Sequence, residues 1–288
     1  MKRNKLILII VFVVIAYILG LILLMNRLQK GNVGIIKTKA IGVIEVEGMI
    51  LDAKPIVRQL KTYAKNPFIK AIVLRIDSPG GGVSASQEIY NEINKVKTKG
   101  KKIVVSMGAV AASGGYYISC PADIIVANPG TLTGSIGVIM EYPMVEELLK
   151  KLGIKMEVIK SREHKDIGSP FRKMTEREKR LLSEVVIDIY QQFVDVVSTN
   201  RNLSKDKVLD LADGRILSGQ QAQKLGLVDS LGSYEDAIRI ASNMVGISGE
   251  PYIIKERPKF SLLKRLFSRS LNYLVSPIPM FLYRYQTD

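Results

Sequence analysis

Residues 70–82 read KAIVLRIDSPGGG, an apolar run that ends at Asp77 and passes directly into a serine, a proline and three glycines. The length of the run and its branched aliphatic residues predict a buried strand. Residues 83–96 then carry apolar side chains at helical spacing. A strand that turns through glycines into a helix is a building unit of α/β folds.

The same alternation of strands and helices continues on both sides of this unit. A capping box at Thr175 and Glu178 is expected to begin the longest helix. Together the elements predict an α/β architecture with a largely parallel sheet. We expect further strands over residues 41–46, 102–106, 123–127, 136–140 and 155–160, and further helices over residues 112–119, 144–152 and 175–200.

The glycine-rich turn at residues 77–82 is the first stretch that suggests chemistry. Glycines allow positive φ and let backbone N–H groups approach a ligand closely. The turn lacks the Gly-Lys-Ser/Thr of a nucleotide P-loop, and its spacing differs from the dinucleotide fingerprint. It is therefore either a cradle for an anion or oxyanion, or only a tight turn.

A second stretch, residues 108–117, reads GAVAASGGYY and places Ser113 among small residues. Small neighbours would let a substrate backbone reach the hydroxyl, and a helix that begins here would aim the free N–H of Gly114 at the same point. Ser113 is a candidate nucleophile. A serine in such a run is also an ordinary helix N-cap, so both interpretations stay open.

A nucleophilic serine needs a base, and His164 and Lys165 stand side by side in residues 163–166, EHKD. If the segment is extended, only one of the two side chains can point into a given site. A lysine serves as a base where burial makes the neutral amine available, whereas a histidine needs no such environment. A solvated charged loop is the third interpretation. In residues 131–138, TLTGSIGV, Ser135 could hold a neutral lysine or cap a turn.

The N-terminus predicts a membrane anchor. Residues 6–25 contain no charged side chain, and a helix of this length spans roughly 30 Å, the thickness of the bilayer core. The run is too long for a secretory signal peptide and lacks a small-residue cleavage site, so we expect an uncleaved anchor. Positive charge clusters more tightly in residues 1–5 than after the run, which places the N-terminus inside and the remaining chain outside the cytoplasmic membrane.

Composition limits the remaining classes of function. The chain has 288 residues, 47% of them apolar, and a formal net charge of +15. The basic residues are spread along the chain without a nucleic-acid recognition motif, so an anionic membrane surface is the simpler partner and nucleic acid is not expected. Cys120 is the single cysteine, which excludes an intrachain disulfide, and its apolar neighbours suggest a small buried side chain.

Three regions follow from these patterns: an anchor at 1–30, a catalytic domain at 38–248, and a basic, partly apolar tail at 249–288. From Phe260 onward the tail has the pattern of an amphipathic helix that lies on a membrane or packs on its own domain. The apolar residues 271–285 could instead enter a neighbouring groove as a self-substrate or plug.

The ordered set of motifs resembles the signal peptide peptidase A family, a branch of the ClpP/crotonase-like superfamily, over most of the chain. The motifs are residues 77–82 (DSPGGG), 112–117 (ASGGYY), 131–137 (TLTGSIG), 164–166 (HKD) and 214–219 (GRILSG), followed by Ala222 and residues 226–229 (GLVD).

The resemblance implies a fold made of a spiral of ββα units and a serine peptidase with a Ser/Lys dyad. Ser113 is then the nucleophile and Lys165 the general base, while His164 is a bystander. The mechanism implied is acyl-enzyme hydrolysis, with no metal, nucleotide or other cofactor. The substrates implied are remnant signal peptides and unfolded segments.

The resemblance also implies the supporting groups. Gly80 or Gly81, together with Gly114, fall where the family's oxyanion-hole amides lie, and Ser135 matches its lysine-supporting serine. This chain has a single catalytic domain, so it is similar to the short form of the family. That form assembles its active sites as a homo-oligomeric ring.

Two competing functions remain. The first is a crotonase-type acyl-CoA enzyme, because the same fold uses a similar oxyanion hole for thioester enolates; a membrane anchor argues against CoA chemistry. The second is a catalytically inactive membrane scaffold of the same fold, which the presence of both Ser113 and Lys165 disfavours.

Overall fold

The computed structural model describes residues 17, 20, 39–256 and 280–284. The chain divides into two compact units, Met1–Lys39 and Ala40–Asp288. Of the expected anchor at residues 6–25, only Tyr17 and Gly20 fall within the described residues. Among the helices that are described, none is both long enough and apolar enough to cross a membrane. The expected amphipathic helix from Phe260 lies outside the described residues.

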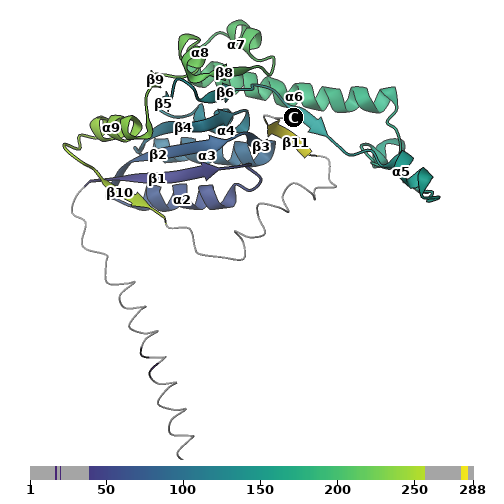
Figure 1. Cartoon of the computed structure of the whole chain (residues 1–288), viewed down its shortest axis with the longest axis horizontal. Helices are drawn as coiled ribbons and strands as arrows, with labels where there is room; N and C mark the ends of the chain where they lie inside the picture. The colour runs from purple at the N-terminus through teal and green to yellow at the C-terminus, as the bar shows by residue number, and fades with distance from the viewer. Residues whose placement is uncertain (1–16, 18–19, 21–38, 257–279, 285–288) are drawn as a thin grey trace, which may run out of the picture. The chain divides into compact units, whose positions relative to one another are not determined.

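The main element of the second unit is an eight-stranded sheet in the order β10-β1-β2-β4-β5-β9, with β6 beside β4 and β8 beside β6 (Figure 1). All pairs are parallel except β6 with β8, which confirms the predicted parallel α/β sheet. The strands are β1 (Ala40–Glu47), β2 (Ile69–Ser78), β4 (Lys102–Ala112), β5 (Ile124–Ala127), β6 (Leu132–Gly134), β8 (Ile216–Ser218), β9 (Ser230–Leu231) and β10 (Tyr252–Lys255).

Helices cover the sheet because alternate residues of each strand face opposite sides. Val73 of β2 packs with α9, whereas Leu74 packs in the larger core that includes α2, α3, α4 and α6. Contacts of this kind bury both faces, as parallel sheets require. The helices are α2 (Lys54–Lys65), α3 (Val83–Thr98), α4 (Gly114–Ser119), α5 (Glu146–Lys151), α6 (Glu176–Arg201), α7 (Lys205–Leu211), α8 (Gly219–Lys224) and α9 (Tyr234–Met244), with the short 3₁₀ turn η1 (Glu163–Asp166) before α6.

A second, smaller sheet lies at the edge of the domain. It contains β3 (Gly80–Gly82), β11 (Met280–Arg284) and β7 (Ile139–Glu141), with β11 in the middle. β11 runs antiparallel to both neighbours and pairs Tyr283 with Gly81. A strand from the C-terminal tail is therefore inserted beside the glycine-rich turn (Figure 1).

Several predicted elements are confirmed, including the helix after the glycines and α6 with its capping box at Thr175. The strand expected over residues 155–160 was wrong: residues 154–160 belong to no helix or strand. A strand needs a pairing partner, and Val158 and Ile159 are 50% and 104% exposed instead. β4 also continues to Ala112, six residues beyond the predicted end, which is needed to pair with β6.

Candidate active site

Ser113 lies on a strained turn between β4 and α4. Its backbone has φ 53° and ψ −116°, a conformation that is unusual for a residue with a side chain. Two backbone hydrogen bonds hold it there: its N–H donates to the Gly134 carbonyl at 2.8 Å, and its carbonyl accepts from the Tyr117 N–H at 2.8 Å. Strain of this kind persists only where the surroundings impose it, and it clusters at functional sites.

The Ser113 hydroxyl is buried without a partner. The residue is 1% exposed, and its Oγ makes no hydrogen bond to any described residue. In particular, it makes no capping hydrogen bond to α4, so the geometry does not support the N-cap interpretation. A buried hydroxyl without a partner destabilises the fold by about 1–3 kcal/mol, and such groups call for a functional explanation.

The glycine-rich turn presents one N–H group towards the second sheet. The Gly80 N–H donates to Ser78 Oγ at 3.1 Å, and the Gly82 N–H donates to the Ile50 carbonyl at 2.8 Å. Because backbone groups of successive residues in a strand point to opposite edges, the Gly81 N–H faces away from Ile50 and towards β11. Of the two glycines expected at the oxyanion hole, Gly80 therefore has its N–H engaged within the turn, whereas the N–H of Gly81 faces the edge at which β11 pairs.

Close packing requires glycine at positions 81 and 115. A Cβ atom on Gly81 would lie 2.3 Å from the Ile50 carbonyl oxygen, and one on Gly115 would lie 2.8 Å from the Ser78 carbonyl oxygen. The turn at β3 and the start of α4 are therefore packed without room for side chains. The first turn of a helix leaves its N–H groups unpaired within the helix, and Gly114 is the first residue of α4.

Strand register brings Ser135 next to Ser113. β4 and β6 are parallel, and Ala112 pairs with Gly134, so the residues that follow each of them are neighbours. Ser135 is 7% exposed, has a φ of 49°, and its N–H donates to the Arg215 carbonyl at 2.8 Å. The structure thus groups the glycine turn, Ser113 and Ser135 at the carboxyl ends of β2, β4 and β6, where α/β sheets commonly bind ligands.

Lys165 is not part of this group within a single chain. It lies on η1, is exposed, and lines a cavity with its neighbours and with Arg177 of α6. Neither Ser113 nor Ser135 lines that cavity. His164 lines the same cavity, and its Nε2 lies 3.7 Å from a Glu163 carboxylate oxygen.

β11 is the feature of this site that strand and helix patterns missed. Its residues pair with both β3 and β7, so an extended segment of the chain lies directly against Gly81. The predicted entry of residues 271–285 into a groove is consistent with this pairing. The strand itself is short and follows a long stretch of tail, so its pairing partners could not be read from its own pattern.

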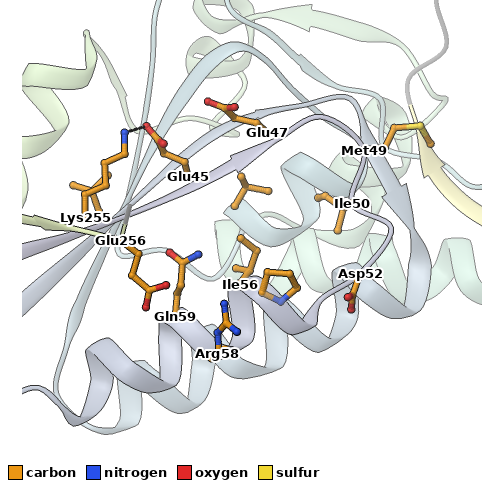
Figure 2. A pocket seen from close by; sticks show the side chains of 13 residues that line it. Glu45, Glu47, Met49, Ile50, Asp52, Ile56, Arg58, Gln59, Lys255 and Glu256 are labelled. Carbon is orange, nitrogen blue, oxygen red and sulfur yellow. Dashed lines mark hydrogen bonds and ion pairs between the residues drawn. The ribbon is translucent and has the colours of Figure 1, made fainter. Parts of the chain in front are cut away.

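A larger cavity lies elsewhere on the domain. It has a volume of about 870 Å³ and is lined by residues of β1, α2 and β10. Figure 2 shows the Glu45–Lys255 ion pair at one side of this cavity and Met49 and Ile50 at the other. Ser113 does not line it. Within the part of the chain that the structure describes, no group of His, Cys, Asp and Glu residues is arranged to hold a metal ion.

Cys120 directly follows α4 and packs in the core. Its side chain is fully buried, and burial raises the pKa of the thiol to about 12. A thiol with so high a pKa is a poor nucleophile. The prediction of a small, buried cysteine is confirmed.

Comparison with known proteins gives consistent matches. The model of peptidase family S49 matches residues 95–248, and the Clp protease model matches residues 39–128. A protein of Synechocystis sp. that is named as a candidate protease is 44% identical over 232 residues, which cover 79% of this chain and 83% of that protein. A protein of Methanocaldococcus jannaschii, also named as a candidate protease, is 36% identical over 271 residues, which cover 88% and 86%.

A more distant relative carries the catalytic type in its name. The chloroplastic serine protease SPPA of Arabidopsis thaliana is 34% identical over 207 residues, which cover 72% of this chain and 30% of that protein. The S49 match includes both the strained serine on its turn and the segment that carries Lys165. On these matches the chain belongs to peptidase family S49, the signal peptide peptidase branch of the ClpP-like superfamily, and is a serine-type peptidase.

Proposed function

We propose that this protein is a membrane-anchored endopeptidase in which Ser113 attacks the scissile peptide bond and Lys165 is the general base. The observation that carries the proposal is the buried, unpartnered hydroxyl of Ser113 on a strained turn just before α4, the helix that contacts β3. Fold stability does not explain a residue that is both strained and unsatisfied, whereas a nucleophile held ready for a base and a substrate does.

In the proposed reaction, the neutral amine of Lys165 accepts the Ser113 proton as Oγ attacks the substrate carbonyl carbon. The N–H groups of Gly81 and Gly114 stabilise the oxyanion of the tetrahedral intermediate, with a contribution on the order of 3 kcal/mol per donor. The protonated lysine then gives its proton to the leaving amine. A water molecule, deprotonated by the same amine, hydrolyses the acyl-enzyme and restores the serine.

We further propose that a second copy of the chain delivers Lys165. Within one chain this lysine is exposed and lines a cavity that excludes Ser113. Exposed apolar side chains lie on the same segment before η1 and on α6, a pattern typical of surfaces that another protein covers. A contact there would bury the amine and favour its neutral form. The apolar side chains are Met144, Leu148, Leu152, Ile154, Met156, Val158, Ile159, Leu181, Val185 and Ile187.

The substrate is proposed to bind as an extended strand. β11 already pairs with β3 and β7 in this way, which supports a binding mode in which backbone hydrogen bonds hold a peptide against Gly81. Ser135 is proposed to position the lysine amine, since strand register places it beside Ser113. Remnant signal peptides are the proposed substrates, and residues 6–25 are the proposed anchor that holds the enzyme at the membrane, with its domain outside the cytoplasm.

Peptide hydrolysis and covalent labelling by the full-length protein in detergent test the dyad. Wild-type protein should cleave a fluorogenic signal-peptide substrate and should be labelled at Ser113 by an alkyl fluorophosphonate. Ser113→Ala should abolish both, and Lys165→Ala should lower both by at least about 1,000-fold while circular dichroism stays unchanged. If Lys165→Ala stays active and His164→Ala does not, the base is wrong. Retained acyl-CoA turnover in Ser113→Ala would point to crotonase chemistry instead.

A further inference from the structure

The segment that carries Lys165 has almost no hydrophobic anchorage. Between residues 137 and 177 the structure buries only Gly168, and neither α5 nor η1 contains a buried residue. A 3₁₀ turn of four residues is too short to hold its own conformation. Polar contacts must therefore fix the backbone from which Lys165 projects.

One guanidinium group, that of Arg172, supplies the densest of those contacts. Its Nε and Nη2 each donate to a carboxylate oxygen of Asp166 at 2.7 Å. Its Nη1 and Nη2 donate to the two carboxylate oxygens of Glu178 at 2.9 and 2.6 Å. Arg172 thus holds two carboxylates at once in bidentate geometry, which the planar fork of arginine allows and the point charge of lysine does not.

The two carboxylates belong to parts of the chain with different anchorage. Asp166 directly follows Lys165 on η1. Glu178 is 2% exposed and lies in the first turn of α6, where it accepts a hydrogen bond from the Thr175 N–H at 2.9 Å. Farther along α6, Phe193 is fully buried in the core. Arg172 therefore ties a loosely packed turn to a helix that the core holds in place.

We propose that Arg172 is a positioning residue that clamps Asp166 to Glu178 and thereby fixes Lys165 in the place from which its amine serves Ser113. The inference rests on the proposed role of Lys165 as the base. Among the described residues, no hydrogen bond joins Arg172 to the Lys165 side chain, so its effect passes through the backbone of η1.

The positive and negative charges balance in the clamp that Arg172 forms with Asp166 and Glu178. Asp166 and Glu178 face Arg172, and Lys160 donates to Asp166 at 2.6 Å, which gives two negative and two positive groups. Hydrogen bonds from Arg172 lower the pKa of both carboxyls, that of Glu178 to about 2. Removing the guanidinium would leave the Glu178 carboxylate buried without a countercharge, which destabilises strongly.

Two variants separate positioning from stability. Arg172→Gln breaks both sides of the clamp, whereas Asp166→Asn weakens only the side at η1 and keeps the Arg172–Glu178 pair. As a matched control, Arg239→Gln removes an Arg–Asp contact on the surface of α9. As a second control, Ser233→Ala removes the capping box of α9 and lowers stability far from the site.

The experiment measures kcat and KM for a fluorogenic peptide and the rate of Ser113 labelling by an alkyl fluorophosphonate, with the full-length protein in detergent. We expect Arg172→Gln and Asp166→Asn to lower kcat and the labelling rate by about 10- to 100-fold with KM nearly unchanged, because a misplacement near 1 Å costs about 100-fold. The kcat and labelling rate of Arg172→Lys should lie between those of Arg172→Gln and wild type. Both α9 variants should keep wild-type rates.

Wild-type kcat in both folded clamp variants would refute the positioning role. The positioning role would also be refuted if Ser233→Ala lost as much kcat as the clamp variants at the same loss of stability. The loss of activity would then follow from lower stability anywhere in the domain. Lys165→Ala separates the two proposals: if it stays active, the proposed base is wrong. If it is inactive while Asp166→Asn and Arg172→Gln turn over normally, only the clamp is wrong.

Discussion

Replacing Ser113 by alanine should abolish activity and at the same time stabilise the fold. The structure gives the direction of the change in stability. The Ser113 Oγ is buried without a hydrogen-bond partner, and an unsatisfied hydroxyl of this kind costs about 1–3 kcal/mol. Alanine removes the hydroxyl but keeps the same backbone strain, so the strain cancels in the comparison.

The expected gain can be stated as a shift in unfolding temperature. For a domain of this size, 1 kcal/mol corresponds to about 2–4 °C, so a gain of about 1–3 kcal/mol should raise the unfolding temperature by roughly 2–12 °C. Ser119 is the matched control, because it is a buried serine in the short helix that follows Ser113, and its Oγ donates to the Gly115 carbonyl at 2.7 Å. Ser119→Ala loses that bond and should be destabilised by about 0.5–1.5 kcal/mol.

The chain has no tryptophan, so thermal unfolding of the full-length protein is best followed by circular dichroism at 222 nm. Each alanine variant is made both in the wild type and in Lys165→Ala, which removes any hydrogen bond that a second copy gives to Ser113. If Ser113 were an N-cap, Ser113→Ala would instead lose about 1 kcal/mol. A fall in unfolding temperature in both backgrounds would refute the account of the strained, unsatisfied serine.

Three further predictions concern the surroundings of the site. Gly81→Ala would place Cβ 2.3 Å from the Ile50 carbonyl oxygen and displace β3, so kcat should fall by about 100- to 1,000-fold. Gly130→Ala is the control, because a Cβ at Gly130 meets open space, and it should keep wild-type activity. Equal rates in the two variants would contradict the prediction. Deleting residues 280–288 removes the strand that pairs with β3 and β7. If β11 competes with substrate for this position, kcat/KM for peptides should rise, and an unchanged value would show that it does not compete. The pKa of Glu178 is lowered from 4.5 to about 2 in the fold, so its contribution to stability is present above pH 4.5 and is lost as the pH falls towards 2. Glu178→Gln should therefore reduce the loss of stability between pH 4.5 and 2, measured by unfolding at a series of pH values. An unchanged loss of stability would assign the acid sensitivity to other groups.

Local patterns predicted much of the fold because the relevant signals are short in range. The apolar run before the glycines became β2, and Thr175 and Glu178 form the capping box of α6. The expected strand at residues 155–160 failed because alternation predicts an extended conformation but not a partner for it. The position of β11 between β3 and β7 depends on contacts between residues about 140 and 200 positions apart, which no local pattern contains.

The site was predictable in its components but not in its assembly. Strand endings and glycine-rich turns made Ser113 and Ser135 candidates, and the family resemblance added Gly80 or Gly81. Parallel pairing of β4 with β6 brings the two serines together. Arg172 was not predicted, because an arginine in a charged segment resembles a solvated surface residue until its two carboxylate partners are known. A site shared between copies, as proposed for Lys165, lies outside what periodicity in one sequence can indicate.

The most direct test of the central proposal mixes two inactive proteins. Ser113→Ala retains an intact Lys165, and Lys165→Ala retains an intact Ser113. If the dyad forms between copies, an equimolar mixture that has exchanged subunits at random should regain about a quarter of wild-type peptidase activity, because about one site in four then contains both residues. The mixture should also recover fluorophosphonate labelling of Ser113 on the Lys165→Ala chain. A mixture that exchanges subunits, shown by fluorescence energy transfer, yet stays as inactive as its components would contradict a Ser113/Lys165 dyad shared between copies.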